Sequence, residues 1–256
     1  MSIGFIDFDI TILLLLFLVS FCAGFVDSIA GGGGMITIPA LLLSGVSPIE
    51  ALGTNKLQSS FGSFSATCSF YQKGYINLQK SFPLAILVFI FSGLGTISVQ
   101  FINTAFLSKF LPFLVLSFGV YFLFAPKITE ESQKKPQITL LFFALAGIGF
   151  YDGFFGPGTG SFLMIALLMF GGYGLTCSLA HAKLYNFSTN FASVVFFALG
   201  GNILWGLGFI MAIGQFFGAR LGSRAAIKYG IKIIKPLIVL VSFLMSAKLL
   251  YEQFML

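Results

Sequence analysis

The stretch GFVDSIAGGGG at residues 24–34 interrupts a long apolar segment with one carboxylate and four consecutive glycines. A second stretch, GFYDGFFGPGTG at residues 149–160, has a similar composition and also lies inside an apolar segment. Each break is followed by a Lys-Leu pair, at Lys56 in the first half of the chain and at Lys183 in the second. Asp27 and Asp152 are 125 residues apart and the two lysines 127 residues apart, so one structural unit occurs twice.

The composition around these breaks indicates the class of protein. Of the 256 residues, 57% are apolar and 9% are charged, whereas a soluble domain has about 25% charged residues. This much apolar surface does not fit into one core, so we expect an integral membrane protein. The net charge of +6 comes from sparse basic residues in short loops. It indicates attraction to anionic lipid and a positive-inside bias, and not nucleic-acid binding.

The apolar segments predict an all-α membrane protein with two inverted repeats, each a broken helix hairpin followed by three transmembrane helices. A full crossing needs ~20 residues, so residues 9–45 and 138–171 are each too long for one span and too short for two. Backbone that is not helical at membrane depth is tolerated only inside protein or beside a wet cavity. Both breaks are therefore expected in the interior. The expected segments are 9–30, 34–45, 48–71, 81–102 and 107–125, then 138–155, 159–171, 174–199, 202–222 and 233–251.

A hydrophilic stretch at residues 126–136, rich in charge and bounded by prolines, divides the chain into repeats at 1–125 and 137–256. If each broken hairpin crosses the membrane an even number of times, most lysines and arginines lie on one side. These include the linker lysines and a basic loop from Arg220 to Lys235. The positive-inside rule then predicts a cytoplasmic linker, repeats of opposite orientation and both termini outside.

Asp27 and Asp152 are the carboxylates that lie well inside apolar sequence. A charge in the membrane costs ~2.5–3.5 kcal/mol on insertion scales, so each is expected to be paired, protonated or functional. Each could anchor the neighbouring glycine turn by accepting hydrogen bonds from backbone N–H groups. Each could instead serve as a coupling residue that binds and releases a proton, and sodium coupling is the alternative. The two roles are compatible.

The glycines of the two breaks are too numerous for packing alone. Glycine lets backbone N–H groups approach a ligand without a Cβ in the way. The short arms that begin near Met35 and Ser161 point helix N-termini at the breaks, and helix N-termini favour anions. Tight packing of the hairpins is the competing interpretation. The candidate substrate-binding positions here are Gly31, Gly32, Gly33, Gly34, Gly156, Gly158, Thr159 and Gly160.

Lys56 and Lys183 each begin an apolar segment that carries a polar stripe. Polar residues recur at three- and four-residue spacing, which places them on one helical face. Such a face lines a bundle interior, since lipid would not accept it. The candidate substrate contacts are Asn55, Lys56, Lys183 and Asn186, because ammonium and amide donors suit a small oxyanion. The alternative is that each lysine pairs with an aspartate. The stripes are Ser59, Ser60, Ser63 and Thr67 in the first half, and Asn186, Asn190 and Ser193 in the second.

These motifs resemble the TauE/SafE sulfite exporter family of bacterial permeases. The first break is followed by IPAL at 38–41 and ALGTNKLQ at 51–58, and the second by AKL at 182–184. The resemblance covers nearly the whole chain. Within the family, the chain resembles a poorly characterised inner-membrane subgroup most. It implies a multi-pass carrier in the bacterial inner membrane for sulfur-containing anions such as sulfite or organosulfonates.

The sequence thus predicts a secondary transporter that moves a small anion by alternating access, with proton coupling through Asp27 or Asp152. An anion channel, or an accessory subunit without transport activity, is the alternative. We expect no enzyme, no cofactor and no metal site, because His181 is the one histidine and no His/Cys/Asp cluster exists in the sequence. The expected partners are a small anionic solute and membrane lipid, without nucleic acid, and a homo-oligomer is left open.

Overall fold

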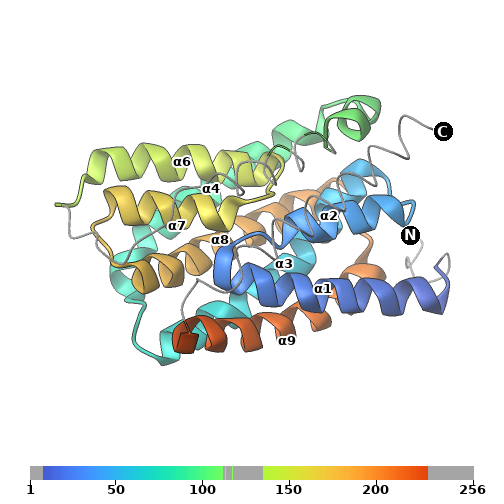
Figure 1. Ribbon diagram of the computed structural model, residues 1–256. Coiled ribbons are helices and arrows are strands. Elements are labelled where there is room, and N and C mark those ends of the chain that lie inside the picture. Colours follow the sequence, from blue (N-terminus) through green and yellow to red (C-terminus); the bar gives the residue numbers. More distant parts are fainter. Residues whose placement is uncertain (1–7, 112, 114–116, 118–134, 230–256) are drawn as a thin grey trace.

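The computed structural model describes residues 8–111, 113, 117 and 135–229, in which every regular element is a helix (Figure 1). The first half contains α1 (Ile10–Ala30), α2 (Gly34–Leu43), α3 (Pro48–Gln72) and α4 (Leu78–Gln100), followed by a helical stretch at 104–111. The second half contains α6 (Ile138–Phe154), α7 (Thr159–Phe170), α8 (Leu175–Leu199) and α9 (Trp205–Tyr229). The segment expected at 233–251 and most of the linker expected at 126–136 lie outside the described residues.

Both predicted breaks are confirmed, and glycines at left-handed φ angles produce them. Gly31 ends α1 with φ of 78°, and its amide donates to the Asp27 carbonyl. Gly156 and Gly158, with φ of 95° and 81°, separate α6 from α7. Residues with a Cβ rarely adopt such angles, so the chain reverses where the glycines occur.

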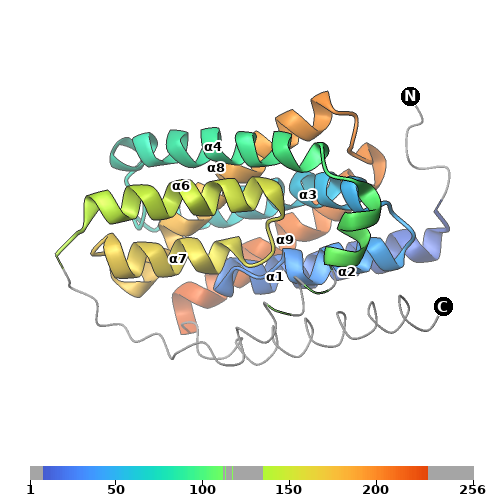
Figure 2. The ribbon, with the colours of Figure 1, turned by 90° about the horizontal axis from the view of Figure 1, so that it is seen from above.

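The two hairpins α1–α2 and α6–α7 meet at their turns and extend from there in opposite directions (Figures 1 and 2). The Ser161 hydroxyl at the start of α7 donates to the Ala30 carbonyl at the end of α1. A Cβ added to Gly31 would overlap the backbone of Gly160 and Ser161. Two breaks far apart in sequence therefore form one contact, which we call the hairpin junction (residues 30–34 and 155–161).

Helices α3 and α8 pack against each other, and the remaining helices surround them. Helix α1 packs along α9, and its second-half counterpart α6 packs along α4. Helix α3 also contacts α9, and α8 contacts α4. Each half therefore packs its helices mainly against helices of the other half. Three glycines at four-residue spacing permit the α1–α9 contact, because a Cβ at any of them would overlap a carbonyl of α1; these are Gly214, Gly218 and Gly222.

The outer helices present apolar side chains outward and the interior is unusually polar. By length and hydropathy, α1 and α4 are the described helices that could each cross a membrane. Many hydroxyl, amide and charged side chains on α3 and α8 are buried. This distribution is that of an all-helical membrane protein. The exposed apolar residues of the outer helices include Leu14, Leu15, Leu18, Phe82, Ile86, Ile90, Leu94, Phe142, Phe143, Phe209, Ile213, Phe217 and Leu221.

One expectation about the basic residues is wrong. Arg220, Arg224 and Lys228 lie on α9, which continues to Tyr229, and not in a loop. The stretch from Ser223 to Tyr229 contains no glycine or proline, and arginine, alanine and lysine favour helix. The helix therefore continues past its apolar part. Lys232 and Lys235 lie outside the described residues.

Candidate functional site

Two buried ion pairs join the halves of the protein at the hairpin junction. Lys56 Nζ lies 2.7 Å from Asp152 Oδ1, and Lys183 Nζ lies 2.8 Å from Asp27 Oδ2. The lysine of each half thus pairs with the aspartate of the other half. Both lysines are at most 1% exposed. These pairs match the alternative that the sequence left open beside substrate contact, in which each lysine pairs with an aspartate. They explain how two ammonium groups are held in an apolar bundle.

Asp27 is fully engaged by its neighbours. Its Oδ1 accepts a hydrogen bond of 3.1 Å from the Gly33 amide, and its Oδ2 accepts one from Lys183 Nζ. Lys183 also donates to the Asp27 backbone carbonyl. The carboxylate therefore fixes the turn between α1 and α2 and connects that turn to α8. This is the anchoring role that the sequence suggested for an aspartate beside a glycine turn.

Asp152 has the corresponding position in α6 but different contacts. Its Oδ1 accepts from Lys56 Nζ, whereas its Oδ2 is buried and has no hydrogen-bond partner among the residues that the structure describes. The turn after α6 is instead held by the Tyr151 hydroxyl, which donates to the Pro157 carbonyl over 2.6 Å. A buried oxygen without a partner is costly. The two aspartates are therefore equivalent in sequence and different in structure.

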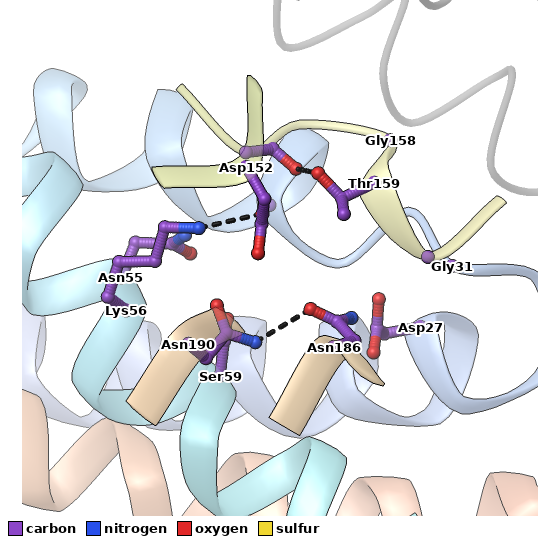
Figure 3. A pocket seen from close by; sticks show the side chains of 13 residues that line it. Asp27, Gly31, Asn55, Lys56, Ser59, Asp152, Gly158, Thr159, Asn186 and Asn190 are labelled. Carbon is purple, nitrogen blue, oxygen red and sulfur yellow. Dashed lines mark hydrogen bonds and ion pairs between the residues drawn. The ribbon is translucent and has the colours of Figure 1, made fainter. Parts of the chain in front are cut away.

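A small polar cavity of about 20 Å³ lies between the hairpin junction and helices α3 and α8 (Figure 3). A single water needs about 10–15 Å³, so a polyatomic anion requires the junction to widen. Most of the predicted site residues line the cavity, whereas Gly32, Gly33 and Lys183 do not. The lining residues are Asp27, Gly31, Gly34, Asn55, Lys56, Ser59, Asp152, Gly156, Gly158, Thr159, Gly160, Asn186 and Asn190.

The cavity offers several hydrogen-bond donors to a ligand. Helices α2 and α7 begin at Gly34 and Thr159 on its wall, and neither has a side-chain cap on its first turn. Their dipoles, with the amides of Gly34 and Gly160, therefore favour an anion there. The next amides, those of Met35, Ile36, Ser161 and Phe162, donate to backbone carbonyls instead. The amide oxygen of Asn55 accepts from Thr37 and from Gln58. This orients the Asn55 NH₂ group as a donor toward the start of α2, where it would lie 3.6 Å from a Cβ at Gly34.

The sequence did not identify every residue that lines the cavity or joins the two hairpins. Ser59 and Asn190 belong to the predicted polar stripes, and they line the cavity although neither was chosen as a substrate contact. Ser161 was missed, because its role depends on the meeting of two distant turns and no local pattern indicates it. His181 stacks on Tyr173, with ring centroids 4.6 Å apart, and its Nδ1 lies 2.8 Å from the Cys177 carbonyl. These contacts support a structural role for the histidine.

Comparison of the sequence with known proteins identifies a family and several relatives. A family model described as "Sulfite exporter TauE/SafE" matches residues 16–249. A "Probable membrane transporter protein" of Haemophilus influenzae is 48% identical over 249 residues, which cover 96% of this chain and 98% of that protein. The "Probable membrane transporter protein YfcA" of Escherichia coli K12 is 47% identical, covering 93% and 89% of the two chains. No solved structure matches the chain.

The family match spans both glycine breaks, both lysines and both aspartates of the ion pairs. The relatives are similar over nearly their whole length and carry the name of probable membrane transporters. This chain is a membrane protein that belongs to the TauE/SafE sulfite exporter family.

Proposed function

We propose that this protein is a secondary transporter of small anions, with sulfur-containing anions such as sulfite or organosulfonates as its substrates. The observation that carries the proposal is the hairpin junction itself. Two buried lysines, each paired with an aspartate of the other half, lie beside two uncapped helix N-termini. Isolated ion pairs would stabilise a bundle poorly, so their position beside the positive ends of two helix dipoles favours a binding role.

The anion would lie between the first turns of α2 and α7. The N–H groups near Gly34 and Gly160 would donate from the two helices, and Asn55 and Asn186 would donate from α3 and α8. Lys56 would supply the positive charge once its bond to Asp152 is loosened. Charge-assisted hydrogen bonds of this kind are about twice as strong as neutral ones. The name of the matched family favours an oxyanion of sulfur.

Alternating access would follow from inverted repeats at residues 1–125 and 137–256, joined by a cytoplasmic linker at 126–136. The opposed hairpins and the exchanged packing of α1 on α9 and α6 on α4 support this arrangement. Rocking of one repeat against the other would open the junction to each side in turn. We place the protein in the bacterial inner membrane with both termini outside. For an anion that crosses without a proton, an inside-negative potential of 100 mV favours outward movement of each negative charge by ~2.3 kcal/mol.

Flux measurements on purified protein in liposomes test this function. We expect labelled sulfite or methanesulfonate to cross the membrane with saturable kinetics. Both Lys56→Ala and Lys183→Ala should lower the flux at least about tenfold, because each removes a charge at the junction. Lys80→Ala is the matched control, since Lys80 is exposed at the start of α4, and its flux should equal that of the wild type.

Two results would contradict the proposal. The first is the observation of single-channel currents in a lipid bilayer. Such currents would show that the protein is an open pore without alternating access. An absence of flux and of binding for sulfite, sulfonates and small carboxylates would leave an accessory role instead.

A further inference from the structure

We infer that Asp152 is the proton-coupling residue of this protein and that Asp27 is not, an inference that rests on the proposed transport of anions. The two carboxylates occupy equivalent positions in the two halves. Asp27 uses both side-chain oxygens, for Gly33 and for Lys183. Asp152 uses one oxygen, for Lys56. Its Oδ2 is buried without a partner in the described part of the chain, and the residue lines the cavity (Figure 3).

The missing partner makes Asp152 the carboxylate that gains from a proton. A neutral carboxylic acid carries a donor that its ionised form lacks. A proton on Oδ2 could be donated to an oxygen across the cavity, where Ser59, Asn186 and Asn190 lie. Protonation of Asp27 would instead weaken its bonds to the Gly33 amide and to Lys183, because both groups donate to the ionised carboxylate. It would also loosen the turn that shapes the junction.

Charge balance then links the proton to the anion. As paired in the structure, two lysines and two aspartates sum to no net charge. An anion entering the cavity would meet the Asp152 carboxylate and a lysine already neutralised by it. A proton on Asp152 removes that repulsion and releases the Lys56 ammonium for the anion. Proton and monovalent anion should therefore bind together, each raising the affinity for the other by the same factor.

The surroundings favour a proton over a metal cation at this position. The Lys56 ammonium lies 2.7 Å from Asp152 Oδ1 and would repel a sodium ion at the same carboxylate. Within the described ranges, the other charged groups at the junction are Asp27 on α1 and its partner Lys183 on α8. On α6 itself Tyr151 donates to the Pro157 carbonyl. Helix α4, which packs along α6, faces it with the uncharged Ser92 and Thr96.

Calorimetric titration of the detergent-solubilised protein with methanesulfonate tests this inference. Methanesulfonate is the anion of a strong acid and stays a monoanion across the pH range used, so any proton taken up belongs to the protein. Titrations in buffers of different ionisation enthalpy should show uptake of about one proton per anion. Because a proton is taken up on binding, the Kd for methanesulfonate should increase as the pH is raised. The increase should reach about tenfold per pH unit where the free protein has lost the proton and the bound protein still holds it.

The variants assign the proton to one carboxylate. Asp152→Asn should bind methanesulfonate without proton uptake and with a Kd that no longer depends on pH. Asp27→Asn is the matched control, and any binding that it retains should still take up a proton. Proton uptake that persists in Asp152→Asn, or that is lost only in Asp27→Asn, would overturn the assignment.

The wild-type titration decides even where a variant does not fold. Anion binding without proton uptake, or with a requirement for sodium, would reject the inference and leave the proposed function standing. If methanesulfonate gives no heat of binding, the same titration is run with sulfite. The protons that free sulfite itself binds at each pH are then subtracted from the measured proton uptake. Absence of binding by both anions would reject the proposed function itself.

Discussion

Replacing Lys56 with methionine is expected to lower the free energy of unfolding by about 3–5 kcal/mol. Methionine is one atom shorter than lysine and carries no charge. The Asp152 carboxylate therefore stays buried, and neither of its oxygens keeps a partner among the described residues. Breaking a buried ion pair from one side costs far more than removing both partners. Unfolding by SDS in mixed micelles, followed by loss of helical circular dichroism, measures the change.

The double variant Lys56→Met/Asp152→Leu separates folding from function. Both charges are then absent, so most of the lost stability should return, whereas anion flux should stay at the level of Lys56→Met alone. Recovery of flux in the double variant would show that Lys56 serves only the ion pair. A single variant as stable as the wild type would show that the Lys56–Asp152 pair does not exist in the folded protein.

Substitution of Gly31 by alanine is expected to have the second largest effect, a loss of about 2–5 kcal/mol. The left-handed φ of 78° costs a residue with a Cβ about 1–2 kcal/mol. The added Cβ would also overlap the backbone of Gly160 and Ser161 on the other hairpin, and overpacking of this kind typically costs about 1–3 kcal/mol. The same unfolding measurement applies, and flux should fall because the two turns are pushed apart.

Gly45→Ala provides the control for backbone strain alone. Gly45 has a similar φ of 83°, and a Cβ at this position would meet no atom of the described residues within 4 Å. It should therefore lose only the ~1–2 kcal/mol of the left-handed conformation. The difference between the two variants measures the contact between the hairpins. Equal losses in Gly31→Ala and Gly45→Ala would mean that the turns do not touch.

Much of the fold was predictable because the membrane imposes a simple length rule on helices. The expected segments 48–71 and 174–199 correspond to α3 and α8, with ends that agree within about two residues. The glycine runs predicted both breaks, because left-handed backbone is needed where a helix reverses. The end of α9 differs from the expected one. Basic residues suggested a loop from Arg220, whereas residues with high helix propensity continue the helix to Tyr229.

The sequence predicted which residues belong to the candidate site, but it did not predict which of them contact one another. The repeat offsets selected the aspartates and lysines, but no pattern in one sequence states that Lys56 pairs with Asp152 and not with Asp27. That pairing follows from the two hairpins meeting turn to turn. The difference between Asp27 and Asp152 was also hidden, because it depends on whether a glycine amide reaches the carboxylate after the chain has folded.

The position of a bound anion tests the proposed site most directly. Selenite resembles sulfite and contains a strong anomalous scatterer, so diffraction from crystals grown with it locates the anion independently of the protein density. We predict one anomalous peak at the hairpin junction, between the first turns of α2 and α7 and within hydrogen-bond distance of Lys56 Nζ. If crystals grown at a saturating selenite concentration show the anomalous peak elsewhere, with the junction closed and empty, the proposed site is contradicted.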